Sequence, residues 1–330
     1  MKEFIFPYEK FKMKISEHFG KEYLMEKVER VLGGAQKFVY KITTQNGFMF
    51  VIYIWHESTS YFSDLEHKDI FTSCSSELFE INNHFMIEHG VCTPKLYYMD
   101  RTKEGFSFEY AYVEYIDGLD IDAIIEKHPE RVEEAMASLK KNLDKMYAIT
   151  SSQAGTLNCL QSKDFSIVAY AFNGAKKNLN YLTDTDLEHK TLYLKADMIL
   201  NKIYGEIEEN EEYCFVHYEL GPNHVMVDEN NVTYLIDIEG AKFFDVEMEY
   251  SFLQMRFGEN YCYLQRDNLD FKKMRFYLLW HYLGNISASY QLLKKNYYDM
   301  DEVRGMISWL TNCLEKFCNS ETSTIHKYVK

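Results

Sequence analysis

Apolar and polar positions alternate with different periods along the chain, and each change of period predicts a new element. Between residues 8 and 29, apolar residues recur at roughly helical steps, at Phe11, Ile15, Phe19 and Leu24. This spacing predicts one or two short amphipathic helices. The next segment, KFVYKITTQNGFMFVIYIW, has β-rich runs on either side of Asn46-Gly47. Because that dipeptide suits a two-residue turn, the segment predicts a β-hairpin.

A helix and two strands are predicted after this hairpin. SSELFEINNHFMIEHG places Leu78, Ile81, Phe85 and Met86 on one helical face. The pattern stops at Gly90, as a helix end should. PKLYYMD and FSFEYAYVEYI then read as strands. Residues 1–117 are therefore predicted to form a small α+β lobe.

Beyond Gly118 the pattern becomes mainly helical. ERVEEAMASLKKNLDKMYAI keeps its apolar residues on one face, and residues 186–208, 271–295 and 302–318 behave similarly. The main β-like island among them is FVHYELGPNHVMVDENNVTYLIDIEGA, in which short strands flank the turn DENN. Residues 118–330 are therefore predicted to form a larger, mainly helical lobe.

Composition and charge narrow the classes of partner. The 330 residues are 46% hydrophobic, enough for a large core or two lobes. A formal net charge of −15 would repel nucleic acid and anionic membranes. The same charge would suit a cationic small molecule, although solubility explains it equally well. The sequence leaves the oligomeric state open.

Cysteine usage and hydropathy predict a cytoplasmic protein. The seven cysteines are odd in number and show no CxxC spacing, which favours buried thiols in a reducing compartment. The N-terminal residues lack an apolar targeting segment, and no apolar run reaches the ~18 residues that a membrane span requires. We therefore expect neither a structural metal nor a membrane partner.

Acidic and histidine side chains gather in the β-like island. His217, Glu219, His224, Asp237 and Glu239 lie at the ends of its predicted strands and could surround one small volume. An oxygen-rich set of this kind suits Mg²⁺ bound to nucleotide phosphates better than it suits zinc. The alternative is an ordinary hairpin with acidic turns, and spacing alone does not decide between the two.

The order of these residues resembles a known catalytic segment. HYELGPNH followed by IDIE is similar to the HGDLxxxN and IDxE motifs of the aminoglycoside phosphotransferase-like small-molecule kinases. VEYIDG looks like the family's hinge, and EHGVCTPKLYY looks like its helix-to-strand crossing. Asp245 and Glu249 echo two acidic residues that follow the family's motifs. The resemblance implies a two-lobed protein-kinase-like fold and Mg²⁺-dependent transfer of the γ-phosphoryl group of ATP or GTP to a hydroxyl.

The resemblance also implies roles for the residues of the island. Glu219 stands where the family has its catalytic aspartate, and its carboxylate could still orient or deprotonate a hydroxyl. His217 would brace the catalytic loop. His224, at the position of the metal-binding asparagine, and Asp237 would bind the metal. Glu239 would either join the metal shell or cap the next turn.

The motifs that bind the nucleotide in the family are less well matched in this sequence than the catalytic segment is. Gly33 and Gly34 would form the loop over the phosphates, although a third glycine is missing. Glu114 and Ile116 belong to the implied hinge, with Ile116 near the adenine. Tyr53 stands where the family has its phosphate-binding lysine, and a phenol brings no positive charge to that position.

With the predicted pairing of the two hairpin strands, Lys41 cannot take the place of the phosphate-binding lysine that is absent at position 53. With a two-residue turn, residue 41 faces residue 52, so Lys41 would point away from the face of Tyr53. The helix carboxylate that would pair with the lysine, Glu77 or Glu80, then has no obvious partner. A second cation that reaches the phosphates, such as Lys37, would favour an enzyme.

Two functions follow from these observations. The first is a nucleotide-dependent kinase that acts on a small, amine-bearing antibiotic or metabolite. The second is a catalytically weak or inactive relative that keeps the fold as a binding module, in which Tyr53 and Tyr40 fill the cleft. The sequence identifies neither the acceptor nor the nucleotide base.

Overall fold

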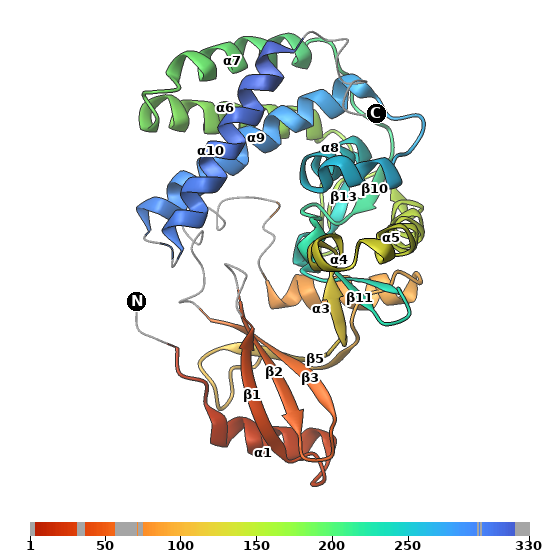
Figure 1. The fold of residues 1–330 in the computed structure, drawn as a ribbon. Helices are drawn as coiled ribbons and strands as arrows, with labels where there is room; N and C mark the ends of the chain where they lie inside the picture. The colour runs from red at the N-terminus through yellow and green to blue at the C-terminus, as the bar shows by residue number, and fades with distance from the viewer. Residues whose placement is uncertain are drawn as a thin grey trace. The chain divides into compact units, whose positions relative to one another are not determined.

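The computed structural model describes residues 4–31, 37–56, 71, 75–295, 297 and 299–320 (Figure 1). The chain forms two compact units. One consists of Met1–Ser138 and His224–Ala241, and the other of Leu139–Asn223 and Lys242–Lys330. The predicted division of the chain into two lobes between residues 117 and 118 stays a prediction. The first compact unit also includes residues 118–138 and 224–241.

The first unit is built on a five-stranded antiparallel sheet in the order β1-β2-β3-β5-β4. Its first elements are α1 (Tyr8–Phe19), β1 (Met25–Val31), β2 (Phe38–Thr44), β3 (Met49–Trp55), α3 (Ser76–Glu88), β4 (Leu96–Asp100) and β5 (Glu109–Glu114). The rest of the unit comprises β6 (Gly118–Asp120), α4 (Ile121–Lys127), η2 (Pro129–Arg131), the start of α5 (Val132–Tyr147), β11 (Val225–Asp228), β12 (Thr233–Leu235) and η4 (Ile238–Gly240). The strands β12, β11 and β6 form a second, three-stranded sheet.

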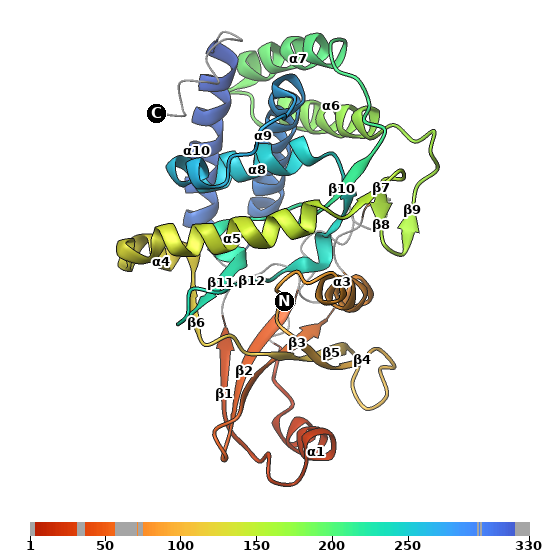
Figure 2. The ribbon, with the colours of Figure 1, turned by 90° about the vertical axis from the view of Figure 1, so that its right-hand side faces the viewer.

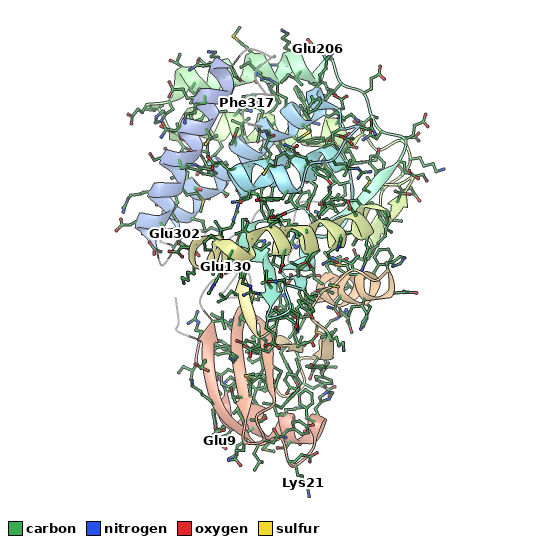
Figure 3. All side chains as sticks on the ribbon, turned by 45° about the vertical axis from the view of Figure 1, so that its right-hand side comes forward. Glu9, Lys21, Glu130, Glu206, Glu302 and Phe317 are labelled. Carbon is green, nitrogen blue, oxygen red and sulfur yellow. The ribbon has the colours of Figure 1, made fainter. Side chains whose placement is uncertain are left out.

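One face of the five-stranded sheet packs against α1. Phe11 and Ile15 of the helix are fully buried against Ile42, Phe50 and Ile52 of the sheet, in a core rich in aromatic rings. Burying such side chains stabilises the fold by about 1.5–3 kcal/mol each. Glu9, within α1, and Lys21, just after it, are exposed (Figure 3). On the opposite face, the buried ring of Tyr53 contacts that of Phe79 from α3.

The predicted β2–β3 hairpin is confirmed, but its register differs from the prediction by one residue. Thr43 pairs with Met49, and the Thr44 N–H donates to the Phe48 carbonyl at 3.0 Å. Three residues therefore connect the strands. Of the Asn-Gly pair, only Gly47 adopts a positive φ, at +82°. A two-residue turn needs positive φ at both positions, whereas a three-residue turn needs it only at the last one.

The N-terminal prediction is correct for α1 and wrong for the residues after it. The helix ends at Gly20, whose N–H donates to the Ser16 carbonyl and whose φ is +119°. Residues 25–31 form β1 and pair with β2. The charged and apolar residues of MEKVERV fit either period, so the available strand partner decides the outcome.

The predicted face of α3 is only partly correct. Leu78 and Met86 are buried, but Ile81 is not, and two polar residues, Asn82 and Asn83, take part in the buried face instead. A polar residue in the middle of a helix lowers the apolar signal of the face it belongs to. The sequence therefore assigned the helix correctly and its orientation incompletely.

The second unit is mainly helical (Figure 2). Its helices are the end of α5, α6 (Ile167–Thr185), α7 (Lys190–Tyr204), α8 (Val246–Phe257), α9 (Phe271–Lys294) and α10 (Met300–Asn319), with the short turns η3 (Pro222–His224), which ends in the first unit, and η5 (Gly258–Tyr263). A small sheet is ordered β7-β10-β13-β8-β9. Its strands are β7 (Thr150–Ser151), β8 (Gly155–Thr156), β9 (Cys159–Leu160), β10 (Tyr213–Val216) and β13 (Lys242–Phe244). The helix α9 packs against α6, α8 and α10.

The helices predicted in the second unit correspond to α5, α7, α9 and α10, whereas α6 and α8 were not predicted. Nearly all of α8 is buried, including Glu247 and Glu249, so it has no polar face to produce amphipathic spacing. Of the helices that the structure describes, none is long and apolar enough to cross a membrane.

Several cysteines that the structure describes are thiols, but not all of these are buried. In the described ranges, Cys159, Cys214, Cys262, Cys313 and Cys318 are free. Cys159 and Cys262 are exposed, which corrects the expectation of buried thiols. Both lie in short elements, β9 and η5, where few other residues can cover a side chain. Cys74 lies outside the described residues.

Candidate active site

The β11–β12 hairpin brings His224 beside Asp237. Val225 pairs with Leu235, and the Ile236 N–H donates to the His224 carbonyl at 3.0 Å. The residues that flank this pairing therefore meet. The Nε2 atom of His224 lies 3.5 Å from Oδ2 of Asp237. The two side chains that the sequence assigned to a metal site are thus neighbours within the first unit.

Asp237 adopts a left-handed backbone conformation, and α3 holds the turn that follows it. The φ and ψ angles of Asp237 are 61° and 43°. Aspartate tolerates this region better than most residues, but the conformation persists only where the surroundings fix it. Asn82 supplies the restraint, because its buried Nδ2 lies within hydrogen-bonding distance of the carbonyls of Ile238, Glu239 and Ala241, at 2.8, 3.3 and 3.2 Å.

A buried lysine pairs with two carboxylates of this loop. Lys37 lies directly before β2, and its Nζ donates to Oδ1 of Asp237 at 2.5 Å and to Oε1 of Glu239 at 2.6 Å. The side chains of Lys37 and Glu239 are only 6% and 3% exposed, whereas that of Asp237 is 36% exposed. Asp237 therefore presents its carboxylate to solvent, and the other two charges are enclosed.

The opposite charges of Lys37, Asp237 and Glu239 offset the cost of burying charged groups. Burial alone would lower the pKa of Lys37, but the attraction of Asp237 and Glu239 outweighs it and raises that pKa above its ordinary value. Burial raises the pKa of Glu239, and Lys37 opposes this effect. The other carboxylate oxygen of Glu239, Oε2, is buried and has no hydrogen-bond partner among the described residues. A buried acceptor of this kind favours a donor from water or a ligand.

Tyr53 lies beside the ammonium group of Lys37. Tyr53 pairs across the sheet with Val39, and the Lys37 Nζ lies 5.0 Å from the centroid of the Tyr53 ring. Burial raises the pKa of the Tyr53 phenol to about 12. Tyr40 faces the other way and packs in the aromatic core with Phe6. The two tyrosines therefore do not fill one space together.

The corrected register also changes the direction of Lys41. Lys41 pairs with Val51, two residues from Tyr53, so the two side chains share a face of the sheet. This finding corrects the prediction that Lys41 points to the opposite face. Its ammonium lies 3.9 Å from the centroid of the Tyr115 ring. Lys41 is therefore directed towards the segment that follows β5, and Lys37 towards Asp237.

The acidic residues of α3 have a different partner from the one that the resemblance implies. Glu77 is 48% exposed and lies 3.5 Å from Arg101, which also pairs with Glu80 at 3.2 Å. These exposed pairs contribute little stability. The carboxylate beside Lys37 is that of Glu239, from η4, and not one from α3.

The other nucleotide-binding candidates lie at the end of β5 or outside the described residues. Glu114 ends β5, and its Oε2 accepts a hydrogen bond from the Lys95 N–H at 3.0 Å. Ile116 is buried. Both belong to the lining of a cavity of about 280 Å³, together with Tyr115, Asp117, Asp228, Glu229, Asn230 and Tyr234. Gly33 and Gly34 lie outside the residues that the structure describes.

The segment from His217 to Glu219 belongs to the second unit and is held by buried charges. His217 is fully buried, and Glu219 is exposed. Between them, Tyr218 has a positive φ of 82°. Its N–H donates to Oε2 of Glu249 at 2.8 Å, and the buried ammonium of Lys242 lies 3.5 Å from the centroid of its ring. These contacts stabilise a backbone conformation that is rare for an aromatic residue.

Two buried carboxylates of this unit hold a proton more tightly than usual. Burial raises the pKa of Glu249 to about 7. Burial also raises the pKa of Asp245 to about 6, although Lys273 and the Tyr277 hydroxyl, which donates to it at 2.5 Å, oppose this shift. Asp245 directly precedes α8, and Glu249 lies within that helix.

The donor set around Asp237 suits a divalent ion that arrives with phosphates. Within the described ranges, no group of three or more His, Cys, Asp or Glu side chains could hold a metal by itself. Mg²⁺ commonly binds through one or two carboxylates plus substrate phosphates, so a complete protein cage is not required. The partly exposed carboxylate of Asp237 and the adjacent His224 imidazole fit this requirement.

The family and the fold follow from comparisons with known proteins. The sequence model of the phosphotransferase enzyme family matches residues 82–271, more than half of the chain. No curated protein sequence matches significantly. The structure is similar to those of aminoglycoside phosphotransferase APH(4)-Ia (TM-score 0.64, 15% identity, 95% of this chain and 99% of that one) and of spectinomycin phosphotransferase APH(9)-Ia with ADP and spectinomycin (0.65, 12%, 96% and 98%). It is also similar to choline kinase LicA from Streptococcus pneumoniae (0.64, 13%, 94% and 99%).

The chain has the α+β, protein-kinase-like fold, with a β-rich N-terminal part and a mainly helical C-terminal part, as the sequence predicted. It belongs to the phosphotransferase enzyme family. The relation to aminoglycoside phosphotransferase-like small-molecule kinases is therefore confirmed.

Sequence reasoning missed two parts of the site. The first is Asn82, whose only signal was its position in an Asn-Asn pair inside a helix, where asparagine is a poor helix former. The second is the pairing of Lys37 with Glu239. Lys37 was considered as a cation, but its partner lies 202 residues away in the sequence, and no local pattern could supply it.

Proposed function

We propose that the protein transfers the γ-phosphoryl group of a nucleoside triphosphate to a hydroxyl of a small, amine-bearing molecule. The observation that carries this proposal is the cluster of Asp237, His224 and Lys37, which combines a partly exposed carboxylate with a fixed cation. Phosphoryl transfer depends mainly on positioning and charge neutralisation, and such a cluster supplies both. Family membership points in the same direction.

On the nucleotide side, each candidate residue has a distinct task. Asp237 and His224 would hold Mg²⁺, which would neutralise the charge of the phosphates when bound. The loop with Gly33 and Gly34 would cover the phosphates. The backbone around Ile116, after Glu114, would contact the base. The nucleotide complexes of similar structures, with ADP, AMP-PNP or AMP, support nucleotide binding.

On the acceptor side, Glu219 would orient the hydroxyl and accept its proton. Glu219 is solvent-exposed, and a glutamate carboxylate has an intrinsic pKa similar to that of aspartate. His217, buried directly before the tyrosine that Glu249 holds, would brace this loop. The similar structures include complexes with hygromycin B and with spectinomycin, and a choline kinase. These similarities favour an amine-bearing acceptor.

The second candidate is a catalytically weak or inactive binding module of the same fold. Tyr53 at the lysine position and Glu219 at the aspartate position favour it. The position of Tyr40 in the aromatic core argues against a cleft filled by two tyrosines.

Transfer of label from γ-labelled ATP or GTP tests the proposal. A panel of amine-bearing alcohols, including aminoglycosides, spectinomycin and choline, is incubated with the protein and Mg²⁺. We expect one class to become labelled, and E219Q to lower that rate by about 10²-fold or more with little change in nucleotide affinity. E212Q, an exposed glutamate close in sequence, is the matched control. Nucleotide binding without labelling of any acceptor would favour the binding module.

A further inference from the structure

The first unit contains a buried ion pair that the family resemblance does not assign. The resemblance expects a lysine on β3 and a carboxylate on α3. Tyr53 stands at the first position, and Glu77 at the second is exposed and lies near Arg101. The described site nevertheless has an enclosed ammonium and an enclosed carboxylate, those of Lys37 and Glu239. Both partners of the pair have different positions in the chain from those of the family.

The geometry gives Lys37 access to the face of the sheet where a β3 lysine would lie. Lys37 precedes the cross-strand partner of Tyr53, Val39, by two residues, and side chains two residues apart share a face of an extended chain. Its Nζ lies 5.0 Å from the centroid of the Tyr53 ring. The ring therefore serves as an apolar surface beside the ammonium, and the lysine approaches from β2 instead of β3.

The hydrogen bonds of the ammonium leave capacity for a ligand. An ammonium has three N–H donors. Within the described part of the chain, Lys37 donates one to Asp237 and one to Glu239. The third N–H can serve a phosphate oxygen without breaking either contact. The partly exposed carboxylate of Asp237 marks the open side of the cluster, where a phosphate carrying a divalent ion would lie.

Glu239 has the properties of an anchor for this lysine. It is almost completely buried, and α3 fixes its backbone through the Nδ2 group of Asn82. In contrast, Asp237 is only partly buried and adjoins His224. The two acidic residues of the IDIE motif therefore differ in role: Asp237 faces the incoming ligand, and Glu239 neutralises and orients Lys37.

We propose that Lys37 and Glu239 together replace the β3 lysine and its α3 carboxylate, so that Lys37 is the phosphate-binding cation of this protein. This inference rests on the proposed function and specifies the nucleotide side of that site. The interaction of Lys37 with phosphate requires no metal, whereas that of Asp237 with phosphate requires one. Binding of ATP and of adenosine, each with Mg²⁺ or with EDTA, therefore separates the roles.

The experiment measures dissociation constants by calorimetry for the wild type and K37M. We expect K37M to weaken ATP binding by about tenfold or more, both with Mg²⁺ and with EDTA, because one charge-assisted hydrogen bond is lost. Adenosine, which carries no phosphate, should bind unchanged. K27M removes an exposed lysine of the same sheet that pairs with Glu29, and it should bind ATP as the wild type does.

Three further variants keep the test decisive. K37M/E239Q removes both enclosed charges, so that no enclosed carboxylate is left without its cation if K37M alone folds poorly. K37M/Y53K returns a lysine to β3, and we expect it to recover ATP affinity. E239Q alone should weaken ATP binding with and without Mg²⁺. A loss seen only with Mg²⁺ would instead make Glu239 a metal ligand and overturn its role as the anchor.

The outcomes separate the inference from the proposed function. If the wild type binds ATP and the folded K37M variant, or K37M/E239Q, binds it equally tightly, then Lys37 is only a structural counter-ion and the inference is wrong, while the proposed function stands. If the wild type binds neither ATP nor adenosine, and neither GTP nor guanosine in the same titration, the proposed function fails and the inference fails with it.

Discussion

At the scale of single residues, the site depends on charged groups that are held in unusual environments. Lys37 keeps its charge because two carboxylates surround it, and a buried pair of this kind costs more to break than it contributes when intact. Asp237 and Tyr218 both have positive φ, at the two segments that the sequence selected as candidates for catalysis. Strain at such positions is typical of functional sites and requires support from the surroundings.

Glu249 gives the second unit a specific dependence on pH. Its pKa is raised from an ordinary 4.5 to about 7, so it contributes stability that is fully present below about pH 4.5 and is lost as the pH rises to about 7. E249Q removes this titration. We expect the free energy of unfolding of E249Q, relative to the wild type, to increase between pH 5 and pH 8 by up to roughly 3 kcal/mol.

Denaturant unfolding at both pH values checks this difference, and the comparison cancels the titration of other groups. E212Q, at an exposed position close in sequence, should show no such change. A difference between E249Q and the wild type that does not vary with pH would contradict the role of burial at Glu249.

Gly47 gives a second test at a single residue. A Cβ at this position would meet nothing within 4 Å, so only the positive φ of +82° disfavours a side chain. G47A should therefore destabilise the protein by about 1–2 kcal/mol. G305A is the matched control, since its Cβ also has open space, but it lies within α10, where alanine favours the helix by up to about 1 kcal/mol. Equal effects of the two substitutions on the denaturation midpoint would contradict the positive φ of Gly47.

At the scale of elements, α3 supports the candidate metal loop through Asn82. N82A removes a buried donor that lies close to three carbonyls of the turn after Asp237. Because the turn then loses this donor, while the Ile238 carbonyl keeps only its bond from the Ala241 N–H, we expect a loss of about 1–3 kcal/mol in the free energy of unfolding. The affinity for Mg²⁺-ATP should also fall, since the turn carries both Asp237 and Glu239.

The matched control for this prediction is N180A, in the exposed face of α6, which should change stability by no more than about 0.5 kcal/mol. Unfolding in urea gives both values, and calorimetric titration gives the affinity. An N82A variant as stable as the wild type would contradict the support of the loop by α3.

The elements also show how far the sequence could predict this fold. The hairpin, α3, α9, α10 and the β11–β12 pair have strong local signals, and all of them are present. The strand β1 depends on its pairing with β2, and α8 is enclosed on all sides, so local periodicity could not define either one. The register of β2 and β3 depended on the backbone of Asn46, which does not adopt the positive φ of a two-residue turn, and a shift of one residue reversed the predicted direction of Lys41.

The candidate site was predictable where it is local in sequence. His224 and Asp237 are neighbours because a short hairpin joins them, and their spacing was visible in the sequence. The contacts of Lys37 with Glu239 and of Asn82 with the same turn join distant segments. Such contacts depend on the complete fold of the first unit, so a single sequence carries no local signal for them.

At the scale of the whole molecule, the family and the fold define a phosphotransferase. The net charge would favour a cationic acceptor over an anionic one. The formal charge of −15 would raise the local concentration of a cationic acceptor and disfavour an anionic one. The nucleotide, which is anionic, must overcome this field locally. Lys37 and a divalent ion at Asp237 are the groups that would allow it to do so.

A thermal melt of the purified protein with ATP or GTP, each with and without Mg²⁺, tests this account most directly. A ligand at a hundred times its dissociation constant adds ~2.7 kcal/mol to the folded state, which is a readily measured increase in melting temperature. We expect the increase to be largest with both nucleotide and Mg²⁺, and the additional effect of Mg²⁺ to disappear in D237N. No increase at millimolar nucleotide, with or without Mg²⁺, would contradict a nucleotide-dependent phosphotransferase.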